Sequence, residues 1–270
     1  MNHILKKTAL FIIKFSLVLL TACNQSVQQA EAVTGADSAT VEIATKAPDF
    51  VAIKDVKAKK KAFFDFMRPI VLAENERVLA ERKRMLAINE AYRKGKTIDP
   101  AEQEWLFALA KSYRISMTEL DSADAWKLLK LRVDSVPFRL ALAQSANESS
   151  WGTSRFAREG NNFFGQWCFS AGCGLVPGKR KPGLTHEVAK FDSVNQSVAS
   201  YIRNLNRGDM YKPLRLVRLE MRDAEKRPTA HALAAGLIGY SERKQEYVDE
   251  IRHMIKKNFD LMAGTVVAVK

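Results

Sequence analysis

The sequence predicts an α+β fold that is mainly helical, with a small β-lobe and a helical region in front of it. Two observations support this prediction. From residue 51 onward, apolar residues recur mostly at three- or four-residue steps, as they do along one face of a helix. This periodicity stops between Gly152 and Lys190, where seven glycines and several aromatic residues indicate loops and short strands. Helices around one small irregular lobe are typical of α+β domains.

Residues 1–22 are expected to be an export signal and not part of the fold. Two lysines precede an apolar run, and Leu20-Thr21-Ala22 stands directly before Cys23. Small residues before a cysteine resemble a bacterial lipobox, which would make residues 1–22 a lipoprotein signal peptide and Cys23 the lipidation site. The alternative is an ordinary signal peptide followed by a chance cysteine. Because Asn24 follows Cys23, the resemblance implies a lipid anchor at the periplasmic face of the outer membrane, with the inner membrane as the alternative.

The next two segments differ in their periodicity. Residues 23–50 are rich in Gln, Ala, Thr and Ser without an apolar period, so a flexible tether is expected. Residues 51–134 are expected to form a helical N-terminal region. Within it, Asp99 should cap a helix that begins at Pro100, with Glu102 capping in return. We expect no catalytic group in this region.

A second region, residues 135–262, should contain further helices around the β-lobe, and residues 263–270 form an apolar tail. The lobe is expected between residues 152 and 190. Helices are predicted from Pro137 to about Ser149, from Ser193, after Thr229, and from about Glu242 to Phe259.

The charge balance bears on the kind of partner. The chain has 43 basic and 30 acidic residues, and its formal charge is +13. This excess favours an anionic partner such as a cell-wall polymer or lipid headgroups. We expect no nucleic-acid partner, because no helix-turn-helix or RNA-binding signature accompanies the charge and the chain carries an export signal. The sequence leaves the oligomeric state open.

The cysteines and histidines indicate a disulfide and no metal. Cys168 and Cys173 lie five residues apart, and in an exported chain such a pair is expected to form a local disulfide. The four histidines are scattered and form no metal-ligand motif. We therefore expect neither a metal nor a cofactor.

Glu148 is the candidate for acid catalysis. It should lie near the C-terminal end of its helix, where the helix dipole disfavours a negative charge, and the nearby Trp151 can desolvate it. Both effects raise a carboxyl pKa. A carboxyl group that stays protonated can donate the proton that the leaving oxygen of a glycosidic bond requires. The alternative is an ordinary surface glutamate.

One stretch of the chain carries a family pattern: Gln144, Glu148-Ser149-x-Trp151-Gly152-x-Ser154 and Asn161-Asn162-Phe163-Phe164-Gly165. It resembles the glucosaminidase family of bacterial peptidoglycan hydrolases, and among them the Bax-type proteins, which add an N-terminal helical region. The resemblance implies a lysozyme-like fold and cleavage of β-1,4 bonds next to N-acetylglucosamine.

The resemblance also implies roles for single residues. Glu148 matches the catalytic acid, and Gln144 and Trp151 belong to the same motif and are expected at the substrate. Asn162, Phe164 and Gly165 match the turn that shapes the floor of the cleft. Phe163, Phe164 and Trp167 could stack on sugars, although any two of them could instead be core residues.

A tyrosine and a second carboxylate complete the predicted site. Tyr240 matches a tyrosine of the family's Y-A-T-D-P-x-Y segment that is thought to assist at the anomeric centre. Here the Asp-Pro is missing, and Tyr240 and Tyr247 lie seven residues apart instead of six. Glu187 is the candidate second carboxylate by elimination, and His186 beside it could tune it. The alternative is that Glu187 is a strand residue and that Tyr240 or the substrate's acetamido group assists.

These observations favour a lipid-anchored endo-β-N-acetylglucosaminidase that acts on the glycan strands of peptidoglycan. A muramidase or a lytic transglycosylase on the same fold is the alternative enzyme. A non-catalytic wall-binding lipoprotein is the alternative from another class, and the intact Glu148 argues against it.

Overall fold

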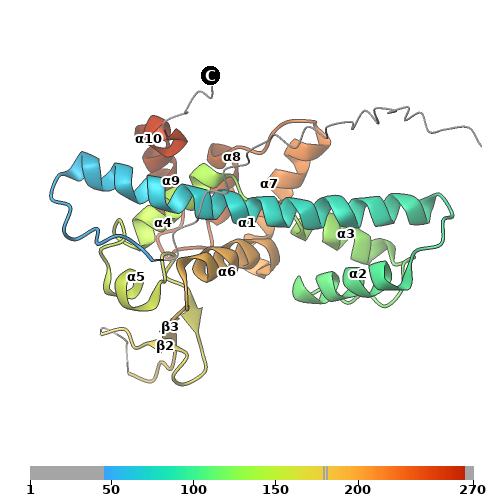
Figure 1. Cartoon of the computed structure of the whole chain (residues 1–270), viewed down its shortest axis with the longest axis horizontal. Coiled ribbons are helices and arrows are strands. Elements are labelled where there is room, and N and C mark those ends of the chain that lie inside the picture. The colour runs from blue at the N-terminus through green and yellow to red at the C-terminus, as the bar shows by residue number, and fades with distance from the viewer. Residues whose placement is uncertain (1–45, 179, 181, 265–270) are drawn as a thin grey trace, which may run out of the picture. The chain divides into compact units, whose positions relative to one another are not determined.

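The computed structural model describes residues 46–178, 180 and 182–264 (Figure 1). The predicted signal peptide, the lipidation site at Cys23, residues 23–45 of the tether and residues 265–270 of the tail lie outside the described residues. In the described part of the chain, none of the helices combines the length and the apolar character needed to cross a membrane.

The N-terminal region is helical, as the sequence predicts. Helix α1 spans Val56–Arg93, and α2 and α3 span Pro100–Ser112 and Ala123–Arg132. Asp99 caps α2 by accepting a hydrogen bond from the backbone N–H of Ala101 at 2.8 Å. The expected return cap is wrong, because the Glu102 carboxylate instead pairs with Arg84 of α1 at 2.8 Å. This ion pair joins α2 to α1.

Within the described residues after α3, seven further helices follow, together with two short 3₁₀ turns at residues 209–211 and 235–237. Ser193 caps α6 and Thr229 caps α8, where the sequence placed helix starts. Helix α7 was not predicted from the sequence; its inner face places the buried Arg215 and Arg218 beside Leu214, Val217 and Met221 of the main core. The helices are α4 Phe138–Glu148, α5 Arg155–Gly160, α6 Val194–Arg207, α7 Lys212–Asp223, α8 Ala230–Ala234, α9 Gln245–Lys257 and α10 Phe259–Ala263.

The β-lobe is a small antiparallel sheet within residues 152–190. Its strands β1, β2 and β3 span Trp167–Cys168, Gly174–Leu175 and Glu187–Ala189, in the order β1-β3-β2. Gly174 is required here, since a Cβ at this position would lie 2.0 Å from the carbonyl oxygen of Val188. The mainly helical α+β class predicted from the sequence is confirmed.

Two apolar cores lie along α1. The main core joins the N-terminal half of α1 to α4, α6, α8 and α9, and the smaller core joins its C-terminal half to α2 and α3. In Figure 1, α2 and α3 accordingly lie beside one end of α1. The boundary expected at residue 134 therefore does not separate two cores, because α1 belongs to both.

The predicted tether, residues 23–50, includes a residue that belongs to the folded domain. Phe50 is 1% exposed and packs against Phe63 and Phe66 of α1, with ring centroids 5.4 and 6.1 Å away. Its ring also occupies the space beside Gly152, where a Cβ would lie 2.3 Å from Phe50 Cδ2. Phe50 therefore belongs to the main core and packs the chain just before α1 against the segment after α4.

Candidate active site

Glu148 is the last residue of α4, and its side chain is half-buried. Helix α9 packs against α4 and brings Tyr247 to the carboxylate. The Tyr247 hydroxyl donates a hydrogen bond to Glu148 Oε1 at 2.8 Å. Because these two residues are 99 positions apart, the contact exists only once both helices are packed.

A chain of hydrogen bonds extends from Glu148 into the core. The Tyr247 hydroxyl accepts a hydrogen bond from Gln144 Nε2 at 2.9 Å, and Gln144 Oε1 accepts one from the Tyr201 hydroxyl at 2.6 Å. Gln144 is 0% exposed, so it cannot meet a substrate as expected from the sequence. Instead it positions Tyr247, and through Tyr247 it positions the Glu148 carboxylate.

The pKa of Glu148 is raised above its ordinary value, chiefly because burial disfavours the charged form. The negative charge of Glu250 on α9 raises this pKa further, while the hydrogen bond from Tyr247 lowers it. The raised pKa agrees with the prediction from the sequence, which attributed part of the desolvation to Trp151. In the structure, Trp151 contributes to the packing of the main core. Trp151 packs edge-on against Phe63 and Phe64 of α1, with ring centroids 5.7 and 5.2 Å away.

The turn after α5 faces the same carboxylate. Gly165 has a φ of +61°, and a Cβ at this position would lie 3.6 Å from Glu148 Oε2. Asn162 holds the turn, because its Oδ1 accepts from the backbone N–H groups of Phe164 and Gln166 at 3.2 and 3.1 Å. Its Nδ2 donates to the carbonyl of Ala189 in β3 at 2.8 Å. Asn162 is 1% exposed and therefore shapes the turn without reaching a substrate.

Phe164 and Tyr240 also support this turn. The buried Phe164 ring stacks on Tyr201, with centroids 3.9 Å apart. The Tyr240 hydroxyl donates to the carbonyl oxygen of Phe164 at 2.9 Å, and its ring stacks on Tyr247 at 5.3 Å. The hydroxyl that donates to Glu148 thus belongs to Tyr247, while the hydroxyl of Tyr240, the tyrosine expected to assist at the anomeric centre, bonds to the turn. The sequence held one signal for such a tyrosine. Gln144 and Glu148 lie four residues apart on one helix face, so a single tyrosine hydroxyl can bond to both.

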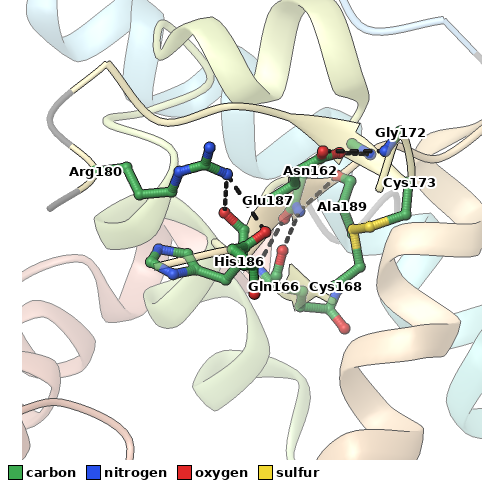
Figure 2. The surroundings of a disulfide bond; sticks show 11 residues. Asn162, Gln166, Cys168, Gly172, Cys173, Arg180, His186, Glu187 and Ala189 are labelled. Carbon is green, nitrogen blue, oxygen red and sulfur yellow. Dashed lines mark hydrogen bonds between the residues drawn. A yellow bond between two sulfur atoms is a disulfide. The ribbon is translucent and has the colours of Figure 1, made fainter. Parts of the chain in front are cut away.

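Glu187 lies in the β-lobe, where both of its oxygens are occupied (Figure 2). Oε1 accepts from the backbone N–H of Gly172 at 3.0 Å, and Oε2 accepts from that of Gly174 at 2.7 Å. These bonds favour the charged form and lower the pKa of Glu187. The carboxylate thus holds the loop between β1 and β2, which argues against the catalytic role inferred by elimination.

The expected disulfide between Cys168 and Cys173 is present and closes the same loop (Figure 2). The two sulfurs and the Glu187 carboxylate lie within 4.8 Å of one another. This is not a usable ligand set, since the sulfurs are bonded together and the carboxylate is occupied by backbone N–H groups.

Trp167 is the aromatic residue of the motif region that faces solvent. It is 59% exposed and stacks on His186 with ring centroids 4.0 Å apart, whereas Phe163 and Phe164 are core residues. A flat exposed ring supported from behind can stack on the apolar face of a sugar. Of the predicted substrate contacts, Trp167 is exposed, Gly165 and Trp151 are partly buried, and the other three are buried.

Comparisons with known proteins agree with the motif. A family model described as "Glucosaminidase: Mannosyl-glycoprotein endo-beta-N-acetylglucosaminidase" matches residues 123–260. The chain is also similar to Protein bax of Escherichia coli (strain K12), with 33% identity over 217 residues that cover 80% of this chain and 76% of that protein. No solved structure gives a significant match. The residues matched by the family model include Gln144, Glu148, the turn at Gly165 and Tyr247.

Proposed function

This chain belongs to the glucosaminidase family of peptidoglycan-related glycoside hydrolases, and from that premise we propose that it is an endo-β-N-acetylglucosaminidase with Glu148 as the general acid. The observation that carries the proposal is the half-buried Glu148 at the end of α4, with its pKa raised and its carboxylate oriented by Tyr247. The lysozyme-like fold of this family agrees with helices packed around a small antiparallel sheet.

The proposed chemistry begins with a protonated Glu148. Its burial keeps the proton on the carboxyl group at a higher pH than an exposed glutamate would allow. The proton passes to the glycosidic oxygen as the bond to the anomeric carbon breaks, which removes the need to expel an alkoxide. Water then adds its hydroxyl group to the anomeric carbon, and its proton returns to the Glu148 carboxylate. Gly165 leaves the Oε2 side of the carboxylate free of a side chain, so a sugar ring can approach there.

The proposed substrate is the glycan strand of peptidoglycan. The chain's net charge of +13 suits a polymer whose peptides carry carboxylates. Trp167 offers a stacking surface for a sugar on the β-lobe. Digestion of purified sacculi by the purified protein would test this assignment, because the masses of the released muropeptides identify both the substrate and the bond that is cleaved.

A second candidate is a lytic transglycosylase, which works with one carboxylate. The observation that favours it is the commitment of both Glu187 oxygens to backbone N–H groups. The other acid whose charge acts on Glu148 is Glu250, and this residue is ion-paired with Arg243 at 2.5 Å. A reducing-end N-acetylglucosamine in the products supports the first candidate, and 1,6-anhydro-N-acetylmuramic acid supports the second.

We also propose a lipid anchor at Cys23 that holds the enzyme at the periplasmic face of the outer membrane. The support is the lipobox-like sequence before Cys23 and the Asn at position 24. Intact-mass measurement of protein extracted from membranes tests the anchor, and an unacylated Cys23 would refute it.

A further inference from the structure

A cavity lies at the opposite end of α4 from Glu148. Its volume is about 580 Å³, which is in the range of pockets that hold small ligands. Helix α1, the start of α4, the segment between α7 and α8, and the chain around α9 and α10 line it. Because α4 rises by about 1.5 Å per residue, the cavity and Glu148 are separated by roughly 15 Å along the helix. The cavity is therefore distinct from the candidate active site.

One wall of this cavity is apolar and open to solvent. Leu72 and Leu79 of α1 are 39% and 40% exposed, and Phe259 of α10 is 51% exposed. All three line the cavity, together with Phe138 and Ile255. Large apolar side chains that gather around one hollow mark a binding surface more often than scattered ones do. A ligand with an apolar body would remove this wall from water.

The other wall carries two arginines, Arg139 and Arg227. In the described part of the chain, neither Arg139 nor Arg227 forms an ion pair, and no hydrogen bond from either guanidinium is found. The Arg139 guanidinium lies over the Phe259 ring at 3.9 Å, and its Nε is buried. Burial and the charge of Arg227 both lower the pKa of Arg139. An anion between these two groups would relieve their repulsion.

The remaining charges around the cavity are of both signs. Arg222 also lines the cavity, and Asp134 neutralises it at 2.6 Å. The acids nearby are Glu76 on the wall and Asp260, which acts on Arg139. Neither of them lies within ion-pair distance of Arg139 or Arg227 among the described residues.

We propose that this cavity binds an amphipathic anion, with a phosphate or carboxylate between Arg139 and Arg227 and an alkyl chain on the apolar wall. An unbranched alkyl chain fits because Leu72, Leu79 and Phe259 offer carbon surface without hydrogen-bonding groups. The inference is independent of the proposed glycosidase activity, since it concerns a separate cavity and is tested by binding.

The test is calorimetric titration of the purified chain with monomeric decyl phosphate. Arg227 is exposed, so Arg227→Gln should fold normally while it removes one cation from the cavity. Loss of a charge-assisted hydrogen bond should weaken binding about 10-fold or more. Lys226→Gln is the matched control, because the neighbouring exposed Lys226 does not line the cavity.

A second pair of variants tests the apolar wall. Leu72→Gln should also weaken binding, whereas Leu128→Gln should not, since Leu128 has a similar exposure of 37% and lies on α3 away from the cavity. Inorganic phosphate and decyltrimethylammonium should bind far more weakly than decyl phosphate. Equal binding of decyl phosphate to wild type, Arg227→Gln and Leu72→Gln would overturn the proposal, and so would equal binding of the cationic amphiphile.

The source of the ligand is separated by a vesicle assay. Wild type and Arg227→Gln are compared on phosphatidylcholine vesicles that contain phosphatidic acid. A defect of Arg227→Gln in both assays assigns a membrane lipid, and a defect with monomeric decyl phosphate alone assigns a free amphiphile. Either result supports the site, whereas no defect in either assay refutes it.

Discussion

Replacing Tyr247 by phenylalanine tests how the structure orients its proposed acid. The change removes the hydroxyl that donates to Glu148 Oε1 at 2.8 Å and keeps the ring that stacks on Tyr240. A hydrogen bond to a charged group contributes about 1.5–3 kcal/mol. If it orients the carboxyl group in the transition state, kcat/KM should fall about 10- to 150-fold.

The same substitution should change the pH profile in a defined direction. The hydroxyl donates to the ionised carboxylate and so lowers the pKa of Glu148, against the upward effect of burial. Without the hydroxyl, this pKa rises and Glu148 stays protonated to a higher pH. The alkaline limb of the activity profile, which reports loss of the acid's proton, should therefore move to higher pH.

Stability should change as well. Gln144 Nε2 is fully buried and loses its acceptor in Tyr247→Phe. A buried donor without a partner costs about 1–3 kcal/mol, which urea unfolding can measure. The activity assays must therefore be run well below the melting temperature of the variant.

Tyr240→Phe is the matched control. It removes a neighbouring hydroxyl that donates to the Phe164 carbonyl and not to Glu148. It should lower stability by a comparable amount but leave the alkaline limb in place. If Tyr240→Phe shifts the limb and Tyr247→Phe does not, the assignment of Tyr247 to the acid is wrong.

Three other substitutions test the surroundings of the site. Glu187→Gln should lower the melting temperature near neutral pH, because the folded state lowers the pKa of Glu187. The difference in melting temperature from wild type should shrink as the pH falls below the ordinary pKa of 4.5. A difference that does not depend on pH would contradict this account. Trp167→Ala should raise KM for glycan strands with a smaller effect on kcat, and an unchanged KM would exclude Trp167 from substrate stacking. Phe50→Ala should destabilise the fold by about 3–5 kcal/mol in urea unfolding, whereas a tether residue would give no change.

The local signals in the sequence were sufficient for most of the helices. Ser193 and Thr229 cap α6 and α8 by accepting hydrogen bonds from the backbone N–H groups three residues later in the chain. Contacts between residues so close in the sequence can be predicted from the sequence alone. Helix α7 was missed because it buries Arg218, whose guanidinium donates to the carbonyl oxygens of Leu131 and Asp134. Those acceptors lie more than 80 residues away, so the sequence near α7 does not show that an arginine is buried there.

The site divides in the same way between local and long-range information. Glu148 could be identified because the motif around it and the end of its helix both lie within a few residues of it in the sequence. The choice between Tyr240 and Tyr247 depended on how α9 docks on α4, and seven residues of spacing could not decide it. Glu187 was selected as the remaining acid, but its partners are the backbone N–H groups of Gly172 and Gly174. Such partners have no side-chain signature in the sequence.

The most direct test of the central claim compares wild type with Glu148→Gln on purified sacculi. Glutamine keeps the shape of the side chain and can still accept the hydrogen bond from Tyr247, but it cannot deliver a proton. Because the folded state raises the pKa of Glu148, the ionised carboxylate is destabilising above its ordinary pKa, so Glu148→Gln should melt no lower than wild type near neutral pH. Loss of a positioned acid costs about 10²–10⁴ in rate. We predict that mass spectrometry detects muropeptides released by wild type and almost none released by a folded Glu148→Gln protein. Release of the same products at the wild-type rate by the folded variant would contradict the account.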